Sequence, residues 1–496
     1  ELAGHDPDRA LAKPGESALL AWNPRAVPAG GIVTAELTFF RRDVLVGPPG
    51  ARLARAGKGF APVSLVAGNG EVIPLQVIAS RRALERRDAR RRYPDLDEVD
   101  AVRVAFALPE LPGLAMAQFR VRPEPSPRLP AGDVSVSGRR IANGLVEVLV
   151  GGDGMLTLAD RRTGRRFPRL CAVESEPDAG DTYSFAPGAG GAAAATGRPS
   201  VTMHAPGPLT GILEARWQAL DASWRLRVEL RSGEAFVRCT LGIDNRGSDR
   251  RLRARFPTGA AGTGVLAGAA FGAELRGAGA EGAAGSPAEA PVATAPAHRF
   301  VAPAGAEGGL ALLVPGHAEY EWRADGDLLL TLLRSVGQLS RDTLPTRPGH
   351  AGWPTATPLA QCHGQDEVRF ALAPLDGTDA TAAALQRLWE EAFLPPGTRW
   401  LRDAGDLRDG HAAITLEGDD LFVSAIKPAE EGRAVVLRCW NASERAAEGR
   451  WIVSPAPRMA KRVRADESGG ESLRVDPGGV IRFAAPPRGL VTIKVS

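Results

Sequence analysis

The sequence has few cysteines and no long apolar run. Its four cysteines stand at positions 171, 239, 362 and 439 without a C-x-x-C pair, which excludes a zinc knuckle and a disulfide-dense secreted module. Each is predicted to be a small buried side chain. The apolar stretches 310–314 and 328–333 are far shorter than the ~20 residues that a membrane span needs. No transmembrane helix is predicted.

The sequence also lacks an excess of charge, since 61 basic and 58 acidic residues leave a net charge of +3. The one dense basic run lies at residues 81–92, in a stretch that looks helical or looped. A nucleic-acid patch is one interpretation. A solvated excursion between strands is favoured, because acidic residues from Glu85 to Glu98 dilute the positive charge.

The chain has no secretory leader pattern at its start and begins with Glu1. This favours a processed or excised piece of a longer protein, located in the cytoplasm. Asn441 opens a glycosylation sequon, but the unpaired cysteines also favour the cytoplasm. At 496 residues, the chain exceeds the ~250–300 at which single cores stop growing, so we expect two or three domains.

Short alternating strands bounded by Gly, Pro and Asp account for most of the sequence. Val, Leu, Phe and Thr recur at period two or in buried runs at residues 31–40, 101–108, 144–150, 224–230, 235–243 and 328–333. Only residues 380–393 have helical periodicity, with Asp379 as the expected N-cap and Ala384, Leu385, Leu388, Trp389 and Ala392 on one face. The predicted fold class is all-β.

Prolines mark the expected domain boundaries. Pro123, Pro125, Pro127 and Pro130 can only form an extended linker, and Pro395-Pro396 stops the helix. We therefore predict a small β-sandwich at 1–125, a large β domain at 126–400 and a terminal β-sandwich at 401–496. The Ala- and Gly-rich segment 259–297 is predicted to be a poorly ordered surface excursion.

Several motifs make the chain recognisable. Residues 141–164 form a D-G hairpin followed by D-R-R-T-G, residues 178–187 read D-A-G-D-T-Y-S-F-A-P, and residues 245–257 end in L-R-A-R-F-P. The longest motif is L-L-R-S-V-G-Q-L-S-R-D-T-L-P-T-R-P-G-H-A-G at 332–352. These motifs, with A-I-K-P-A-E at 425–430 and L-A-W-N-P at 20–24, resemble the C-terminal β region of glycoside hydrolase family 38 α-mannosidases along essentially the whole chain.

The resemblance implies a central supersandwich of the galactose-mutarotase type and a role beside a catalytic domain. Family 38 enzymes are zinc-dependent retaining α-mannosidases whose zinc ligands, including an H-x-D pair, and catalytic aspartates precede this region. None of the seven histidines here is followed by Asp two residues later. We therefore expect no zinc site and no catalytic residue in this chain, which should be inactive alone, with zinc held by the catalytic domain in cis or on a separate chain.

The resemblance also implies a wall of the mannose-binding cleft. Tyr183 of the D-x-G-D-x-Y motif is expected to reach the sugar, because a phenol covers C–H faces and bonds a hydroxyl. Arg341 and Arg347 are each candidates for a supporting cleft arginine or for an interdomain salt bridge. Asp181 is a further candidate contact, although a turn acceptor of backbone N–H groups is favoured. His350 is expected to be a loop residue and not a ligand.

Two other classes of function stay open at this stage. One is a stand-alone carbohydrate-binding or interaction module, for which tryptophans such as Trp217, Trp224, Trp322 and Trp353 could be sugar platforms, although core positions are favoured. The other, disfavoured, is an independent enzyme of the mutarotase type, which would need a pair such as His317 with Glu319 or Glu321 as acid and base. Neither nucleic acid nor membrane is an expected partner.

Overall fold

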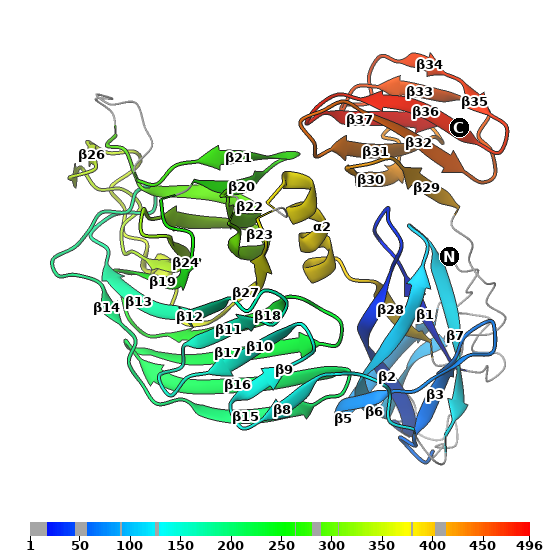
Figure 1. Cartoon of the computed structure of the whole chain (residues 1–496), viewed down its shortest axis with the longest axis horizontal. Helices are drawn as coiled ribbons and strands as arrows, with labels where there is room; N and C mark the ends of the chain where they lie inside the picture. Colours follow the sequence, from blue (N-terminus) through cyan, green and yellow to red (C-terminus); the bar gives the residue numbers. More distant parts are fainter. Residues whose placement is uncertain are drawn as a thin grey trace. The chain divides into compact units, whose positions relative to one another are not determined.

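The computed structural model describes residues 17–44, 57–89, 92–124, 128–262, 264–279, 289–305, 307–377, 380–401 and 413–496. Strands dominate it (Figure 1), and every strand pairing in the large sheet is antiparallel. The helices of the described residues are η1 (Pro358–Gln361) and α2 (Ala382–Phe393), and neither has the length and apolar composition of a membrane span. The predicted all-β class is confirmed.

Two compact units divide the chain. One contains Glu1–Gly132, Gly207–Thr210 and Leu394–Ser496, and the other, here called the central unit, contains Asp133–Pro206 and Gly211–Phe393. The predicted domain boundaries lie at 125/126 and 400/401, whereas the two compact units divide at 132/133 and 393/394. The second difference has a clear cause: β28 (Gly397–Leu401) pairs with β1 (Ala18–Trp22), so the chain after the helix joins the N-terminal sheet.

The central unit contains a large sheet, a smaller sheet and a two-stranded sheet of β25 (Thr343–Leu344) and β26 (Arg347–Pro348). The large one has, in order, β14 (Ala193–Ala194), β13 (Ala172–Pro177), β19 (Arg250–Pro257), β24 (Asp327–Ser335), β23 (Gly309–Trp322), β27 (Gly364–Leu375), β18 (Val237–Asn245), β17 (Ala222–Arg231), β16 (Thr210–Ala219) and β15 (Ser200–Pro206). The strands β20 (Val265–Ala269), β21 (Gly272–Arg276) and β22 (Thr294–Pro303) join it through β23. The smaller sheet has β12 (Arg166–Leu170), β11 (Leu156–Asp160), β10 (Val146–Val150), β9 (Arg140–Ala142) and β8 (Ser135–Ser137).

The core of the central unit contains alternate residues of the large and the smaller sheet. Val146, Val148 and Val150 are buried on β10, and Leu226 and Val228 are buried on β17, which is the period-two pattern of strands with one face in a core. Trp217, Trp224 and Trp322 belong to this core as well. For these three tryptophans, the core position that the sequence analysis favoured over a sugar-binding role is confirmed.

The other unit contains two further cores. The N-terminal residues form the sheet β28-β1-β7-β3-β4 and the ribbon β2-β6-β5, with β2 (Ala29–Val44), β3 (Val63–Val66), β4 (Val72–Ile73), β5 (Gln76–Ala89), β6 (Arg92–Leu111) and β7 (Met116–Pro123). The C-terminal residues form the sheets β29-β32-β36-β35 and β30-β31-β37-β33-β34. Their bounds are β29 (Ile414–Glu417), β30 (Leu421–Pro428), β31 (Val435–Asn441), β32 (Ala447–Val453), β33 (Ala460–Val463), β34 (Glu471–Leu473), β35 (Val475–Asp476), β36 (Val480–Ala485) and β37 (Leu490–Val495).

Two sequence predictions need correction. The basic run is neither helix nor loop, because Arg81 to Ala89 lie in β5, paired with β6; Arg90 and Arg91 lie outside the described residues. The segment 259–297 is not a plain excursion, because it contains the hairpin β20–β21, in which Val265 is fully buried. Residues 280–288 of that segment also lie outside the described part.

Smaller predictions had mixed outcomes. The helix is confirmed, and Thr381 Oγ1 accepts a hydrogen bond from the N–H of Ala384 at 3.1 Å; the predicted cap, Asp379, is not among the described residues. All four cysteines are free, and Cys362 is exposed instead of buried. Asn441 of the sequon is fully buried and its amide donates to backbone carbonyls, so it is inaccessible to glycosylation in the folded protein.

One end of the large sheet gathers the motifs recognised in the sequence. Pro177 pairs with Arg250, which pairs with Ser335. At the same end, Asn245 donates hydrogen bonds to Ser335 Oγ (3.2 Å) and to the carbonyl of Cys362 (3.0 Å). The loops that follow β13, β18 and β24 therefore meet at this end.

Candidate functional site

The motif at 178–187 is a tight loop between β13 and β14 shaped by Asp181. Its Oδ1 accepts hydrogen bonds from the N–H groups of Tyr183 (3.0 Å) and Ser184 (2.9 Å). These are the bonds of an Asx turn, in which an aspartate caps its own backbone. The turn-acceptor role that was favoured for Asp181 is confirmed.

Two arginines of the 332–352 block reach the same carboxylate. Arg347 Nη2 lies 2.5 Å from Asp181 Oδ2, and the N–H of Arg341 donates to that oxygen at 2.8 Å. Asp181 is fully buried and Arg347 is 5% exposed. The block and the loop, about 160 residues apart in sequence, therefore meet around one buried ion pair.

The ion pair controls the protonation of Asp181. Burial alone would raise the pKa of this carboxyl, but hydrogen bonds from Arg347 and from the N–H groups of Arg341, Ser184 and Tyr183 outweigh burial and hold the pKa below its usual value. Asp181 is thus a carboxylate at neutral pH. Its pair with Arg347 lies inside the central unit. The sequence analysis considered a cleft contact or an interdomain salt bridge for this arginine and did not anticipate an internal pair.

A second ion pair fixes the start of the loop. Arg334 lies 2.8 Å from Asp178 Oδ2 and also donates to the carbonyl of Asp181 at 2.9 Å. Asp178 in turn accepts from the N–H of Gly180 at 2.9 Å. The loop is therefore tied to the end of β24 as well as to the block that follows it.

Phe185 anchors the loop to the face of the sheet. The guanidinium carbon of Arg251 lies 3.6 Å from the centre of the Phe185 ring, and that of Arg334 lies 6.0 Å away. Arg251 also pairs with Glu176 at 2.8 Å. A cation over an aromatic face, itself paired with a carboxylate, stabilises this arrangement.

Tyr183 stands on the outer side of this framework. Its side chain is 55% exposed, and its ring centre lies 6.0 Å from the guanidinium carbon of Arg347. A Cβ added at Gly352 would lie 2.8 Å from the Tyr183 hydroxyl, so the absence of a side chain at 352 leaves room for the phenol. Within the described ranges no protein group hydrogen-bonds this hydroxyl.

The segment that follows Gly352 carries exposed apolar side chains. Trp353 is 81% exposed and Leu359 is 94% exposed. His350 is an exposed loop residue, 3.5 Å from Ser340 Oγ and 3.7 Å from Asp342, as expected. Large exposed apolar side chains on adjacent loops are typical of a surface that another protein surface covers.

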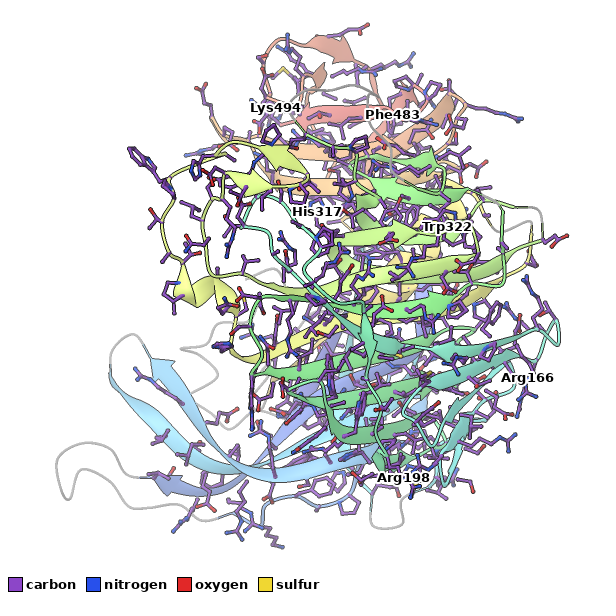
Figure 2. All side chains as sticks on the ribbon, turned by 90° about the vertical axis from the view of Figure 1, so that its left-hand side faces the viewer. Arg166, Arg198, His317, Trp322, Phe483 and Lys494 are labelled. Carbon is purple, nitrogen blue, oxygen red and sulfur yellow. The ribbon has the colours of Figure 1, made fainter. Side chains whose placement is uncertain are left out.

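The acid–base pair imagined around His317 is not arranged for catalysis. His317, on β23 (Figure 2), stacks on His298 at 4.8 Å. Glu319 accepts from Thr331 at 2.6 Å, and Glu321 pairs with Arg253 at 2.6 Å. Burial raises the pKa of Glu321, but Arg323 and Arg253 outweigh it and lower the pKa, which makes this group a poor proton donor at neutral pH.

The described residues do not offer a ligand set for zinc. No group of three or more His, Cys, Asp or Glu side chains gathers anywhere in the part of the chain that the structure describes. His5 and His411 lie outside that part. No step of chemistry is therefore assigned to a metal held by these residues.

Sequence reasoning missed the residues that hold the site together. Asp178, Arg334, Phe185 and Arg251 were not singled out, although all four belong to the motifs that carried the resemblance. A signal was present: an aspartate or arginine inside a conspicuous loop motif needs a partner if it is buried. Gly352 gave no such signal, because only the folded chain brings it to Tyr183.

Comparisons with known proteins show what the fold and these motifs are similar to. Residues 141–342 match the family model "Glycosyl hydrolases family 38 C-terminal domain". A putative mannosylglycerate hydrolase of Halalkalibacterium halodurans is 25% identical over 343 residues, 62% of this chain and 36% of that protein. An alpha-mannosidase of Enterococcus faecalis shares the fold with a TM-score of 0.78 at 17% identity, over 99% of this chain and 57% of that one.

The resemblance seen in the motifs is confirmed for residues 141–342, which match the C-terminal domain model of glycosyl hydrolase family 38. A second family 38 protein from Enterococcus faecalis superposes with a TM-score of 0.76 at 17% identity, over 99% of this chain and 59% of its own. The chain spans 36% of the curated relative and 57% of the first of these structures. The matched residues include Tyr183, Asp181 and Arg341 and end shortly before Arg347.

Proposed function

We propose that the chain is the C-terminal β region of a zinc-dependent, retaining α-mannosidase of family 38. It supports a catalytic domain, present in cis or as a separate chain, and contributes one wall of the cleft that binds a mannose-containing glycan. Zinc belongs to the catalytic domain, where it would act as a Lewis acid and hold the sugar. Tyr183 is the group of this chain that contacts the sugar.

The exposed, unengaged hydroxyl of Tyr183 is the observation that carries the proposal. A half-exposed phenol on a loop held by two buried ion pairs is already positioned, so little ordering entropy is lost when it binds a hydroxyl group. Its ring offers an apolar face to the C–H side of a sugar. The exposed Trp353 and Leu359, which follow Gly352 in the sequence, support coverage by a catalytic domain.

The other three candidate residues, Asp181, Arg341 and Arg347, hold Tyr183 in position. Asp181 and Arg347 neutralise one another in a buried pair, and Arg341 donates its N–H to Asp181 and its Nε–H to the carbonyl of Gly180 at 3.0 Å. We assign them as positioning residues, with the guanidinium of Arg347 under the phenol. Their loss should disturb the sugar contact through Tyr183.

The test replaces only the hydroxyl of Tyr183. We expect Tyr183→Phe, in this chain joined or mixed with a family 38 catalytic domain, to lower kcat/KM for an aryl α-mannoside by about tenfold, the value of roughly one hydrogen bond. The melting temperature should not change, because the described residues give this hydroxyl no protein partner.

Leu275→Ala provides a matched control, because Leu275 is 71% exposed on β21, away from the motif loop. It should leave kcat/KM unchanged. If Tyr183→Phe also leaves kcat/KM unchanged, Tyr183 is not a cleft residue and the assignment of this wall fails. Sugar binding by the chain without any catalytic domain, if Tyr183→Phe abolishes it, would instead favour the stand-alone binding module.

A further inference from the structure

A cavity of about 460 Å³ opens on the central unit, away from Tyr183. Four strands of the large sheet line it: β16, β17, β18 and β27. It shares no residue with the loop at 178–187. Its principal polar lining residues are Arg216, Gln218, Ser223, Arg225, Asp244 and Gln365.

A glycine makes room in this cavity. Gly242 pairs with Arg225 on one side and with Glu367 on the other, so it lies in the middle of the sheet face. A Cβ at position 242 would lie 3.2 Å from Arg225 Nε. The absence of a side chain there lets the guanidinium of Arg225 lie across the strand and leaves the hollow beside it.

Because side chains alternate along a strand, polar side chains face the cavity. On β17, Trp224 and Leu226 are buried in the core, so Ser223 and Arg225 face the opposite side. Within the described part of the chain, the side chains of Gln218, Ser223 and Gln365 have no hydrogen-bond partner. Their amide and hydroxyl groups are free to bind a ligand.

The charges of the cavity lining balance, because it contains two arginines, Arg216 and Arg225, and two aspartates, Asp244 and Asp366. Arg216 pairs with Glu214 at 2.6 Å, Arg225 contacts Glu367 at 3.4 Å, and Asp244 contacts Arg246 at 3.4 Å. Neither an anion nor a cation would meet an excess of opposite charge here. A neutral ligand with many hydroxyl groups suits these mixed donors and acceptors.

From this lining we propose that the cavity is an accessory binding site for a neutral saccharide. Its volume lies within the ~300–1,000 Å³ of ligand pockets, which accommodates one or two sugar rings. The site is separate from the wall at Tyr183 and does not rest on the proposed function. It lies at the same end of the large sheet, since Asn245 pairs with Ala222 and Gly364 and contacts Ser335.

Binding of α-1,2-mannobiose and maltose to the full chain, measured by calorimetry and saturation-transfer NMR, tests this proposal. We expect at least one disaccharide to bind with a Kd of about 1 mM, which corresponds to roughly −4 kcal/mol. The double variant Ser223→Ala/Gln365→Ala should weaken binding at least tenfold. Gly242→Leu, which fills the hollow instead of removing polar groups, should do the same.

A matched control locates the effect. Thr202→Ala removes an exposed hydroxyl from the neighbouring strand β15 and should bind the disaccharide as the unmodified chain does, whereas Tyr183→Phe tests whether the binding belongs to the other site. The proposal is overturned if neither disaccharide binds, if both cavity variants bind within twofold of the original, or if only Tyr183→Phe loses binding. Binding of inorganic phosphate in preference to sugar would overturn the neutral ligand class.

Discussion

Asp181 and Arg347 are each almost fully shielded from water, so each depends on the other for its charge. Removing one partner of a buried pair leaves an uncompensated charge and costs about 3–5 kcal/mol. We expect Asp181→Asn to lower the free energy of unfolding of the central unit by about 3 kcal/mol. Urea unfolding at pH 7, followed by tryptophan fluorescence, measures this loss.

Asp342→Asn is the matched control, because this carboxylate of the same block is 60% exposed and lies 3.7 Å from His350. Its effect should stay within about 0.5 kcal/mol, as for most surface substitutions. If Asp181→Asn were equally mild, the ion pair would not be what holds the loop.

The same pair gives the central unit a pH dependence. Since the pKa of Asp181 is lowered in the folded state, its contribution is fully present above the unfolded value of about 4 and is lost as pH falls. The difference in stability between the original chain and Asp181→Asn should therefore shrink as the pH falls below about 4. Unfolding midpoints measured across this range test the sign, which an equal difference at every pH would contradict.

Gly352 affects Tyr183 only because it has no side chain and so leaves space for the phenol. In Gly352→Ala the new Cβ would lie 2.8 Å from the Tyr183 hydroxyl and 3.2 Å from its ring, so the exposed phenol must move. We expect kcat/KM of the assembled enzyme to fall about as much as in Tyr183→Phe, with little change in stability. The double variant should be no worse than Tyr183→Phe alone, because neighbours that act through one group are not additive; additive losses would contradict this coupling.

The residue types of the site were predictable, but their partners were not. Tyr183, Asp181, Arg341 and Arg347 stand in recognisable motifs, and the Asx turn of Asp181 follows from local spacing alone. The ion pair with Arg347 depends on the strand order of the large sheet, which places the end of β24 beside that of β13 through β19. No local pattern encodes that neighbourhood.

At the scale of elements, a buried arginine links three strands of the large sheet. Arg253 on β19 is 2% exposed and reaches Glu174 on β13 at 2.9 Å and Glu321 on β23 at 2.6 Å. Arg253→Met would remove the cation that Glu174 and Glu321 share, and Arg323 would remain as a partner of Glu321. We expect a loss of about 3–5 kcal/mol in the stability of the central unit, measured by urea unfolding.

Arg255→Met is the control on the same strand. Arg255 is 31% exposed and pairs with Asp327 at 3.2 Å, so its loss should cost less than about 1 kcal/mol. Equal losses in the two variants would mean that the strand needs the arginine stems for packing and not the charge of Arg253.

Element prediction succeeded where the apolar period was clear. The strands expected at 144–150 and 224–230 are β10 and β17, since Val and Leu alternate there. The hairpin of β5 was missed because its arginines carry no strand signal and its pairing with β6 supplies the structure. In the helix, Leu385 and Trp389 are buried as predicted, but Gln386 and Glu390 are also buried, because Gln386 accepts a hydrogen bond from Arg299 at 3.0 Å.

At the scale of the whole molecule, two buried or half-buried carboxylates of the central unit, Asp181 and Glu321, are engaged in structure. Retaining hydrolysis needs two carboxyl groups about 5–5.5 Å apart, one of them a proton donor. Asp181 and Glu321 are paired with arginines and have lowered pKa values. A carboxyl held ionised by a guanidinium cannot donate a proton at neutral pH.

We therefore expect the 496-residue chain, purified alone, to release no product from an aryl α-mannoside, with or without added zinc. The described residues provide no cluster of metal ligands. The measurement is the release of the aryl group over hours at pH 7, with EDTA and zinc arms, beside the same chain assembled with a family 38 catalytic domain as the positive control. Zinc-dependent, EDTA-sensitive turnover by the chain alone at enzyme-like rates would show that its own residues carry the catalytic centre, and the proposed division of roles would fail.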